Sequence, residues 1–229
     1  MPKNNINIIY EDNHFVAINK RSGEIVQGDK TGDVCVVDEL KAFLKKRDDK
    51  PGNVFVGLPH RLDRPTSGAL LLTKTGKALS KINKLIHDRE IDKTYWAIVR
   101  NRPPKDSDKL VHWLQKNEKQ NKSYASKTEK SGYLKAELEY SIIASSDNYF
   151  LLEIKLLTGR HHQIRVQLSE IGCPVRGDLK YGFDRSNRDG SISLHARSLA
   201  FVHPIKNEPI TIVAPAPKEN LWQILEDQV

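Results

Sequence analysis

The sequence predicts an α+β fold, with one domain over residues 1–229 built on a mixed, largely antiparallel sheet flanked by helices. Three observations favour this class. Strand patterns outnumber helical ones, short polar turns join several strand pairs as in hairpins, and the strict strand–helix alternation of a doubly wound parallel fold is missing. The proline-rich break near Asn101 is interpreted as a loop within the domain.

Strands are expected where apolar residues run continuously or alternate with polar ones. One hairpin is predicted over 6–20 with its turn at 11–13, and another pairs 135–143 with 149–157. The other expected strands cover 54–59, 69–73, 93–99, 194–202 and 209–213.

Helices are expected where apolar residues recur at helical spacing. The predicted helices cover 34–44, 77–87, 160–171 and 219–226. The cations of 45–47 suit the C-terminus of the first helix. Thr158 is the expected N-cap of the third, and Gly172 follows its end. Residues 116–130 are polar and rich in lysine, and we expect them to form a mobile loop.

The charge balance points to a polyanionic partner. Lysine and arginine number 37 against 29 acidic residues, which gives a net charge of +8. A basic chain binds nucleic acid through counterion release, although an excess of lysine also aids solubility alone. No apolar run is long enough for a membrane helix, and the N-terminus lacks a signal sequence. We therefore expect a cytoplasmic protein with reduced cysteines at Cys35 and Cys173.

Several common motifs are excluded. The Gly76-Lys77 pair lacks the earlier glycine of a phosphate loop, because Leu71 occupies that position. No dinucleotide-binding glycine motif is present. His161 and His162 are adjacent and would face apart on a helix, so no metal site is expected.

The segment HRLDRPTSG places Asp63 between Arg61 and Arg64. Such flanking cations should keep the carboxylate ionised, and an ionised carboxylate acts as a nucleophile in glycosidases. The alternative is an aspartate that caps its own turn through Thr66 or Ser67 while the arginines face water. The spacing alone favours this alternative.

Two further segments carry chemistry. In TGRHHQIRV, helical spacing puts His161, Arg165 and Leu168 on one face, so Arg165 could pair with a carboxylate or simply face solvent. In KTYWAIV, Lys93 and Tyr95 point the same way along a strand. That pair suits a base stacked near its phosphate, whereas the alternative is a core aromatic residue.

Taken together, these segments resemble the RluA-type family of pseudouridine synthases. HRLDRPTSG resembles the catalytic-aspartate motif and follows the lysine-bearing segment IIYEDNHFVAINK, and KTYWAIV is similar to the tyrosine strand. TGRHHQIRVQL resembles the third motif, and RGDLKYG and LHARSLAFVHP resemble the C-terminal signatures. Five motifs in order, from Ile6 to Pro217, overturn the preference for a structural Asp63.

The resemblance implies the roles of individual residues. Asp63 would be the catalytic aspartate, Tyr95 would pack on the base and assist removal of its C5 proton, and Arg165 would pair with Asp63. The substrate-binding positions implied are His60, Arg61, which would enter the RNA stack, and Arg64.

The resemblance also implies the reaction and the partner. We expect uridines in stem-loops of ribosomal or transfer RNA to be isomerised to pseudouridine, without a cofactor, by a monomer. Relatives often carry a separate N-terminal RNA-binding domain, which this chain has no room for, so its own loops would select the RNA. The departures are Arg21 for a common proline, Pro65 in the turn, and His161 for a usual threonine.

Two alternatives stay open. One is a catalytically inactive RNA-binding protein or RNA chaperone on the same fold. The other is an N-glycosidic hydrolase that releases free uracil. Whether the carboxylate attacks the sugar at C1′ or the base at C6 is not decided by the sequence.

Overall fold

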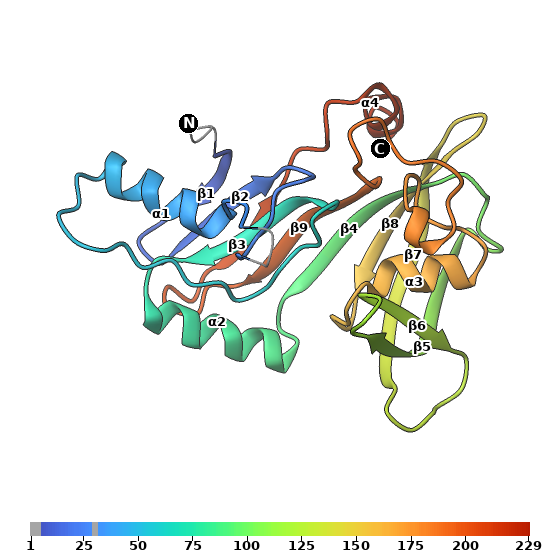
Figure 1. Ribbon diagram of the computed structural model, residues 1–229, viewed down its shortest axis with the longest axis horizontal. Helices are drawn as coiled ribbons and strands as arrows, with labels where there is room; N and C mark the ends of the chain where they lie inside the picture. The colour runs from blue at the N-terminus through green and yellow to red at the C-terminus, as the bar shows by residue number, and fades with distance from the viewer. Residues whose placement is uncertain (1–5, 29–31) are drawn as a thin grey trace. The chain divides into compact units, whose positions relative to one another are not determined.

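The computed structural model describes residues 6–28 and 32–229 and confirms the α+β class (Figure 1). Backbone contacts divide the chain into two compact units. The first unit comprises Met1–Ile91 and Ala196–Pro215, and the second comprises Asp92–His195 and Ala216–Val229. No boundary falls at the break near Asn101, and the assignment of 1–229 to one catalytic domain stays a prediction.

The first unit is a sheet with two helices. Its strands are β1 (Ile8–Glu11), β2 (Phe15–Lys20), β3 (Ser67–Thr73), β9 (Leu194–Val202, from Ala196 onward) and β10 (Pro209–Val213). Its helices are α1 (Val36–Arg47) and α2 (Gly76–Asp88). The pairs β1–β2, β2–β3 and β9–β10 are antiparallel. All seven residues of β3 are buried, as its unbroken apolar run predicts.

The core of the first unit lies between its sheet and α2. Ala78 and Ile82 of α2 pack against Phe15, Leu71 and Phe201 from three strands. Figure 1 shows α1 and α2 on either side of these strands. Leu40 and Leu44 of α1 and Ile82 of α2 are buried, as their spacing predicts, whereas Val34 lies before the start of α1 and is exposed.

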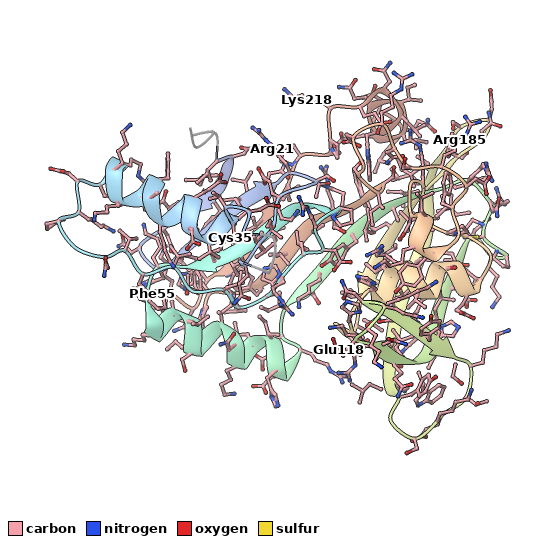
Figure 2. The ribbon with its side chains drawn as sticks, in the orientation of Figure 1. Arg21, Cys35, Phe55, Glu118, Arg185 and Lys218 are labelled. Atoms are coloured by element: carbon pink, nitrogen blue, oxygen red, sulfur yellow. The ribbon has the colours of Figure 1, made fainter. Side chains whose placement is uncertain are left out.

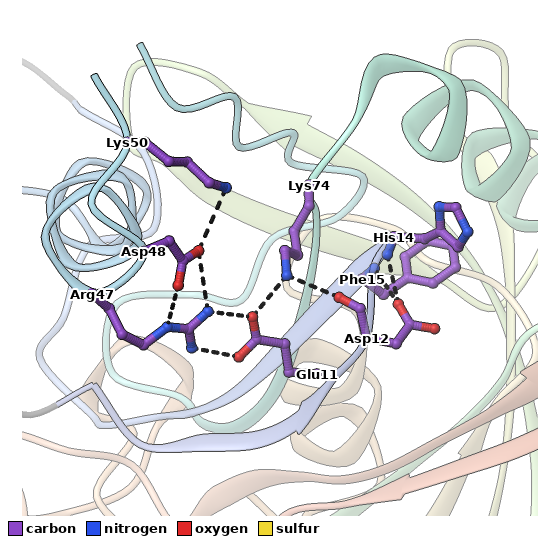
Figure 3. A network of polar contacts seen from close by, with 8 residues as sticks. All are labelled: Glu11, Asp12, His14, Phe15, Arg47, Asp48, Lys50 and Lys74. Atoms are coloured by element: carbon purple, nitrogen blue, oxygen red, sulfur yellow. Dashed lines mark hydrogen bonds and ion pairs between the residues drawn. The ribbon is translucent and has the colours of Figure 1, made fainter. Parts of the chain in front are cut away.

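A polar network secures the β1–β2 hairpin (Figure 3). The Asp12 carboxylate accepts hydrogen bonds from the backbone N–H of His14 and Phe15, each at 2.7 Å. Glu11 binds Arg47 at the end of α1 at 2.6 Å and Lys74 beyond β3 at 2.8 Å. These contacts set the start of β2, whose last residue, Lys20, belongs to the candidate site described below.

The second unit is an antiparallel sheet in the order β4-β8-β7-β5-β6. Its strands are β4 (Asp92–Val99), β5 (Ser107–Asn117), β6 (Lys122–Ser126), β7 (Leu134–Ser145) and β8 (Phe150–Leu156). Its helices are α3 (Gln163–Glu170), the 3-10 turn η1 (Leu179–Tyr181) and α4 (Asn220–Glu226). The predicted hairpin of 135–143 with 149–157 corresponds to β7 and β8.

The two faces of this sheet carry different helices. Ala136 and Leu114 pack against Val166 of α3, so we call their side the α3 face. On the other face, Trp96 packs against Trp222 of α4. The strand that bears Tyr95 thus has one side toward each helix.

Two predicted elements were wrong. Residues 54–59 form no strand and only bridge Thr73 through Gly57, because Pro59 lacks an N–H to continue a ladder. Residues 116–130 are not a mobile loop, since β5 and β6 pair from Trp113–Ser126 to Asn117–Lys122. The buried residues of β6 are Ser123 and Ser126, which are polar, so apolar alternation could not reveal the strand.

The N-terminus of α3 also differs from the prediction. The helix begins at Gln163 rather than Arg160, and its N-cap is His162 with a φ of +53°. Thr158 is not the cap, although its hydroxyl donates to the Gln163 side chain at 2.8 Å. Gly172 does follow the helix end with a φ of +77°, as predicted.

Candidate active site

Asp63 lies in the first unit, in the turn that leads into β3. It is half-buried between two exposed arginines. The Thr66 N–H donates to the Asp63 carbonyl at 3.0 Å and closes the turn. The turn enters β3 through Gly68, whose φ is +115° and where an added Cβ would lie 2.3 Å from the Ala196 carbonyl oxygen. Only glycine can adopt this φ and lie so close to the Ala196 carbonyl, so the close packing at Gly68 fixes the backbone conformation between Asp63 and β3.

Lys20 holds the far side of this turn. Lys20 is 1% exposed, and its ammonium donates to the carbonyl oxygens of Thr66 at 2.7 Å, Arg21 at 2.8 Å and Arg64 at 3.2 Å. The Ser22 hydroxyl donates to the Pro65 carbonyl at 2.9 Å. The end of β2 therefore fixes three successive carbonyl groups that follow Asp63 in the chain.

The charge of Lys20 depends on its surroundings. Burial lowers the pKa of Lys20 to about 8, and the negative charges of Glu24 and Asp63 oppose that shift. The effect of Asp63 on this pKa shows that its carboxylate lies within electrostatic reach of the ammonium. Lys20 thus supplies both hydrogen bonds to the turn and a positive charge near the carboxylate.

The other residues of the motif have separate positions. His60 accepts a hydrogen bond from the Leu71 N–H at its Nε2 atom at 2.9 Å, which ties the motif to β3. Arg64 donates a hydrogen bond to the Gly23 carbonyl. It also forms an ion pair with Asp33 at 3.2 Å, and each of the two side chains is about half exposed. Arg61 is exposed. Both arginines therefore reach the surface, as the alternative interpretation of the motif expected.

Arg165 lies in the second unit on α3 and is buried, not solvated. Its guanidinium binds the Asp178 carboxylate through two hydrogen bonds, Nε to Oδ2 at 2.6 Å and Nη2 to Oδ1 at 2.9 Å. The two side chains are 5% and 1% exposed. A pair of this kind fixes the plane of the guanidinium. Asp178 is the carboxylate partner that the structure describes, and the pairing of Arg165 with Asp63 stays a prediction.

Tyr181 supports the same guanidinium from η1. The Arg165 Cζ atom lies 5.1 Å from the centre of the Tyr181 ring. The Tyr181 hydroxyl accepts from the Ser123 N–H at 2.8 Å and lies within hydrogen-bond distance of Nδ1 of His162, at 2.9 Å. Burial raises the pKa of Tyr181 to about 12, so the hydroxyl stays protonated at neutral pH.

His161 and His162 do not face apart, as adjacent residues on a helix would. Their rings stack with centres 3.7 Å apart, because both residues precede the helix and His162 has a positive φ. His161 also lies 2.8 Å from the Ser123 hydroxyl through Nδ1. The stacked pair therefore joins β6 to the start of α3.

Tyr95 shares the α3 face with the helix that carries Arg165. It pairs with Ile154 of β8, which pairs with Tyr140 of β7. Paired residues lie on one side of a sheet, and Tyr140 lies four residues from Ala136, hence on the same side. Tyr95 is 9% exposed. The second unit thus places the predicted tyrosine and arginine on one face.

No metal or membrane element was found in the parts of the chain that are described. Across residues 6–28 and 32–229, no group of three His, Cys, Asp or Glu side chains is placed to bind a metal ion. None of the helices observed there has the length and apolar character needed to span a bilayer. Both cysteines are buried and free.

The sequence matches a model of the RNA pseudouridylate synthase family over residues 14–170. The chain belongs to this family. The membership confirms the resemblance seen in the motifs and the enzyme class that it implied, an RNA pseudouridine synthase.

Relatives are similar along most of this chain. It is 32% identical to ribosomal large subunit pseudouridine synthase C of Buchnera aphidicola, over 91% of this chain and 67% of the relative. A Haemophilus ducreyi protein of the same name is 33% identical, over 91% of this chain and 65% of the relative. The chain thus spans about two thirds of these proteins. It is 31% identical to tRNA pseudouridine synthase C of Vibrio parahaemolyticus, over 96% of this chain and 93% of the relative.

Solved structures agree on the fold. Human RNA pseudouridylate synthase domain containing 4 superimposes with a TM-score of 0.77 at 24% identity, over 93% of this chain and 89% of that one. Human RNA pseudouridylate synthase domain containing 1 gives 0.75 at 24% identity, over 96% and 86%. The fold is therefore that of pseudouridine synthase domains.

Sequence reasoning missed three residues of the site. Asp178 and Tyr181 belong to RGDLKYG, which was recognised as a signature without a role for either side chain. Lys20 ends a strand that begins with four apolar residues, and a charged residue at such a position was the available signal. All three support other groups, and their roles depend on contacts distant in sequence.

Proposed function

We propose that this protein isomerises specific uridines of ribosomal or transfer RNA to pseudouridine, with Asp63 as the catalytic carboxylate. The observation that carries the proposal is the half-buried Asp63 on a turn held by the buried Lys20, in a chain of the RNA pseudouridylate synthase family. Relatives named for both RNA classes support both as substrates.

The reaction breaks the bond between N1 and C1′, turns the base, and joins C5 to C1′. The C5 hydrogen leaves as a proton and N1 gains one, so the product is an isomer and no redox partner is consumed. The uridine must first leave its stack, which costs a few kcal/mol and favours weakly paired positions. Asp63 acts on the extruded nucleotide, Tyr95 packs on the base and assists loss of the C5 proton, and Arg165 keeps the carboxylate ionised.

The substrate contacts proposed around this centre come from the HRLDRPTSG motif. Arg61 is exposed and enters the RNA stack in place of the extruded base, while Arg64 lies at the surface beside it in the chain. His60 supports the motif through its bond to Leu71. These roles follow the resemblance and need no cofactor.

The β5–β6 hairpin is the proposed RNA-selecting surface of the second unit. Lys122 lies over the rings of Tyr124 and Tyr181, 5.6 and 5.2 Å from their centres. Lys119 is exposed near the turn, whereas Lys116 is paired at 2.7 Å with Glu118. Figure 2 labels Glu118 at this hairpin. Replacing the three lysines with glutamine should lower RNA affinity and its salt dependence, and unchanged values for both would contradict this role.

Tritium release tests the reaction. Transcripts of large-subunit ribosomal RNA and of tRNA are made with uridine tritiated at C5, and tritium in water is counted after incubation. Wild-type protein should release it and Asp63→Asn should not, while Asp147→Asn, in the exposed turn between β7 and β8, should behave as wild type.

Other outcomes separate the alternatives. Full activity in Asp63→Asn would remove the proposed role of that carboxylate. Free uracil in the supernatant would indicate a hydrolase, and RNA binding without tritium release would indicate a binding protein or chaperone. We also propose that the protein acts as a cytoplasmic monomer, which cell fractionation and light scattering on a sizing column would check.

A further inference from the structure

Lys93 lies beside Tyr95 on the α3 face of the second unit. The two residues are two positions apart on β4, so their side chains leave the same side of the strand. Their Cα atoms are about 7 Å apart, since a strand rises about 3.3 Å per residue. β4 pairs with β8 from Thr94 and Lys155 onward, and continuing this register by one residue sets Lys93 opposite Leu156. On the other side of β8, Leu156 pairs with Leu138 of β7. The neighbours of Lys93 in this row are therefore apolar.

The ammonium of Lys93 is half-buried without a counter-charge. Over residues 6–28 and 32–229, it makes no ion pair and no hydrogen bond. Burial lowers the pKa of Lys93, and no carboxylate in the described chain opposes that shift. Lys20, by contrast, is buried with three carbonyl acceptors.

An unpaired, partly desolvated cation is unfavourable in the free protein. Replacing it with an apolar side chain of similar length would stabilise the fold. A feature that costs stability and lies beside a functional residue is typical of a binding site. The occupant must bring a negative charge, and it must reach a position about 7 Å along the strand from Tyr95.

We propose that Lys93 binds a backbone phosphate of the substrate RNA next to the uridine that packs on Tyr95. This inference rests on the proposed function. A phosphodiester is the anion that an RNA substrate carries at every nucleotide, and one nucleotide spans a length similar to the separation of the two side chains. The low-polarity surroundings strengthen the attraction, and the bond would supply the partner that the ammonium lacks in the protein alone.

The test compares Lys93→Met with Lys155→Met. Lys155 is on the adjacent strand, exposed, and on the opposite face of the same sheet, so it controls for loss of one positive charge. The measurements are the melting temperature, the affinity for a radiolabelled ribosomal RNA transcript by filter retention at several salt concentrations, and KM and kcat by tritium release.

Lys93→Met should melt at a higher temperature than wild type yet bind the transcript about tenfold more weakly. The slope of log affinity against log salt should fall by about 0.7 to 0.9, the value for one phosphate contact. KM should rise more than kcat falls, and Lys93→Arg should restore part of the affinity. Lys155→Met should change none of these quantities by a comparable amount.

An unchanged salt slope and affinity in Lys93→Met would overturn the proposal, as would equal losses in both lysine variants. A fall in kcat without a change in affinity would also overturn it, because a phosphate contact acts on binding. Filter retention does not require turnover. Failure of wild-type protein to release tritium would therefore count against the proposed function, while the affinity data would still decide the role of Lys93.

Discussion

Replacing Asp178 with alanine should strongly destabilise the second unit, because it would remove the buried carboxylate that accepts two hydrogen bonds from the Arg165 guanidinium. The pair has two charge-assisted hydrogen bonds of 2.6 and 2.9 Å, and its side chains are 5% and 1% exposed. Breaking a buried pair by removing one partner costs about 3–5 kcal/mol. An exposed pair such as Lys84–Asp88, whose lysine is 77% exposed, contributes little to stability, because water screens its charges.

Urea unfolding of four proteins measures this coupling. The set is wild type, Asp178→Ala, Arg165→Met and the double variant, with Asp88→Ala as the exposed control. Because the two groups interact directly, the double variant should be more stable than the sum of the two single losses predicts, by about 2 kcal/mol or more. In tritium release, Asp178→Ala should also lower kcat, because the guanidinium loses the partner that fixes its plane.

Additive losses would refute this reasoning, since they would mean that the carboxylate and the guanidinium do not stabilise each other. A loss in Asp178→Ala no larger than that in Asp88→Ala would refute it as well. Retention of full kcat would show that Asp178 does not position Arg165 for the reaction.

Three further changes test the first unit. Since burial lowers the pKa of Lys20 to about 8, its ammonium should lose its proton as the pH rises through that value, and kcat should fall with it. Lys20→Arg keeps its charge, so the pH–rate profile of this variant should not show the fall in kcat near pH 8. A hydrogen bond from Arg47 lowers the pKa of Glu11 to about 2. The ionised Glu11 should therefore add about 2 kcal/mol to the free energy of unfolding above about pH 4.5, and this stabilisation should be lost as the pH falls toward 2. In urea unfolding at a series of pH values, Glu11→Gln should lose less stability than wild type over this range. Gly68→Ala should lower stability by at least about 3 kcal/mol in urea unfolding, because its Cβ would meet the Ala196 carbonyl; a loss below 1 kcal/mol would show that the backbone can move there.

Local patterns were sufficient to predict most of the fold. The unbroken apolar run of β3 and the helical spacing in α2 match elements that bury those residues. Both hairpins with polar turns were also found where expected. These elements are predictable because periodic burial decides them, and burial periodicity is visible in sequence.

The rest depended on long-range contacts. β6 is buried through serines, one of which donates to the distant carbonyl of His161, so no apolar pattern marks it. The stacking of His161 and His162 follows from a positive φ at His162, a conformation that histidine seldom adopts. The partner of Arg165 lies 13 residues further along the chain, beyond any helical spacing rule.

Lys20 of the first unit and Lys93 of the second show how a buried charge distinguishes structural from functional roles. Lys20 is more deeply buried, yet three carbonyl oxygens accept its hydrogen bonds, and two of them, those of Arg64 and Thr66, belong to the turn after Asp63. Its ammonium makes all three of these hydrogen bonds in the protein without substrate, so we infer that Lys20 stabilises the turn. Lys93 is less buried but has no partner within the described chain, so its bonds are left for a ligand. The same replacement by methionine should therefore act in opposite directions on stability. It should destabilise the fold at position 20, where carbonyl acceptors would be left unpaired, and stabilise it at position 93, where an unpaired charge would be removed. A rise in melting temperature at both positions would show that desolvation outweighs the hydrogen bonds even at Lys20, and would remove this basis for assigning their roles.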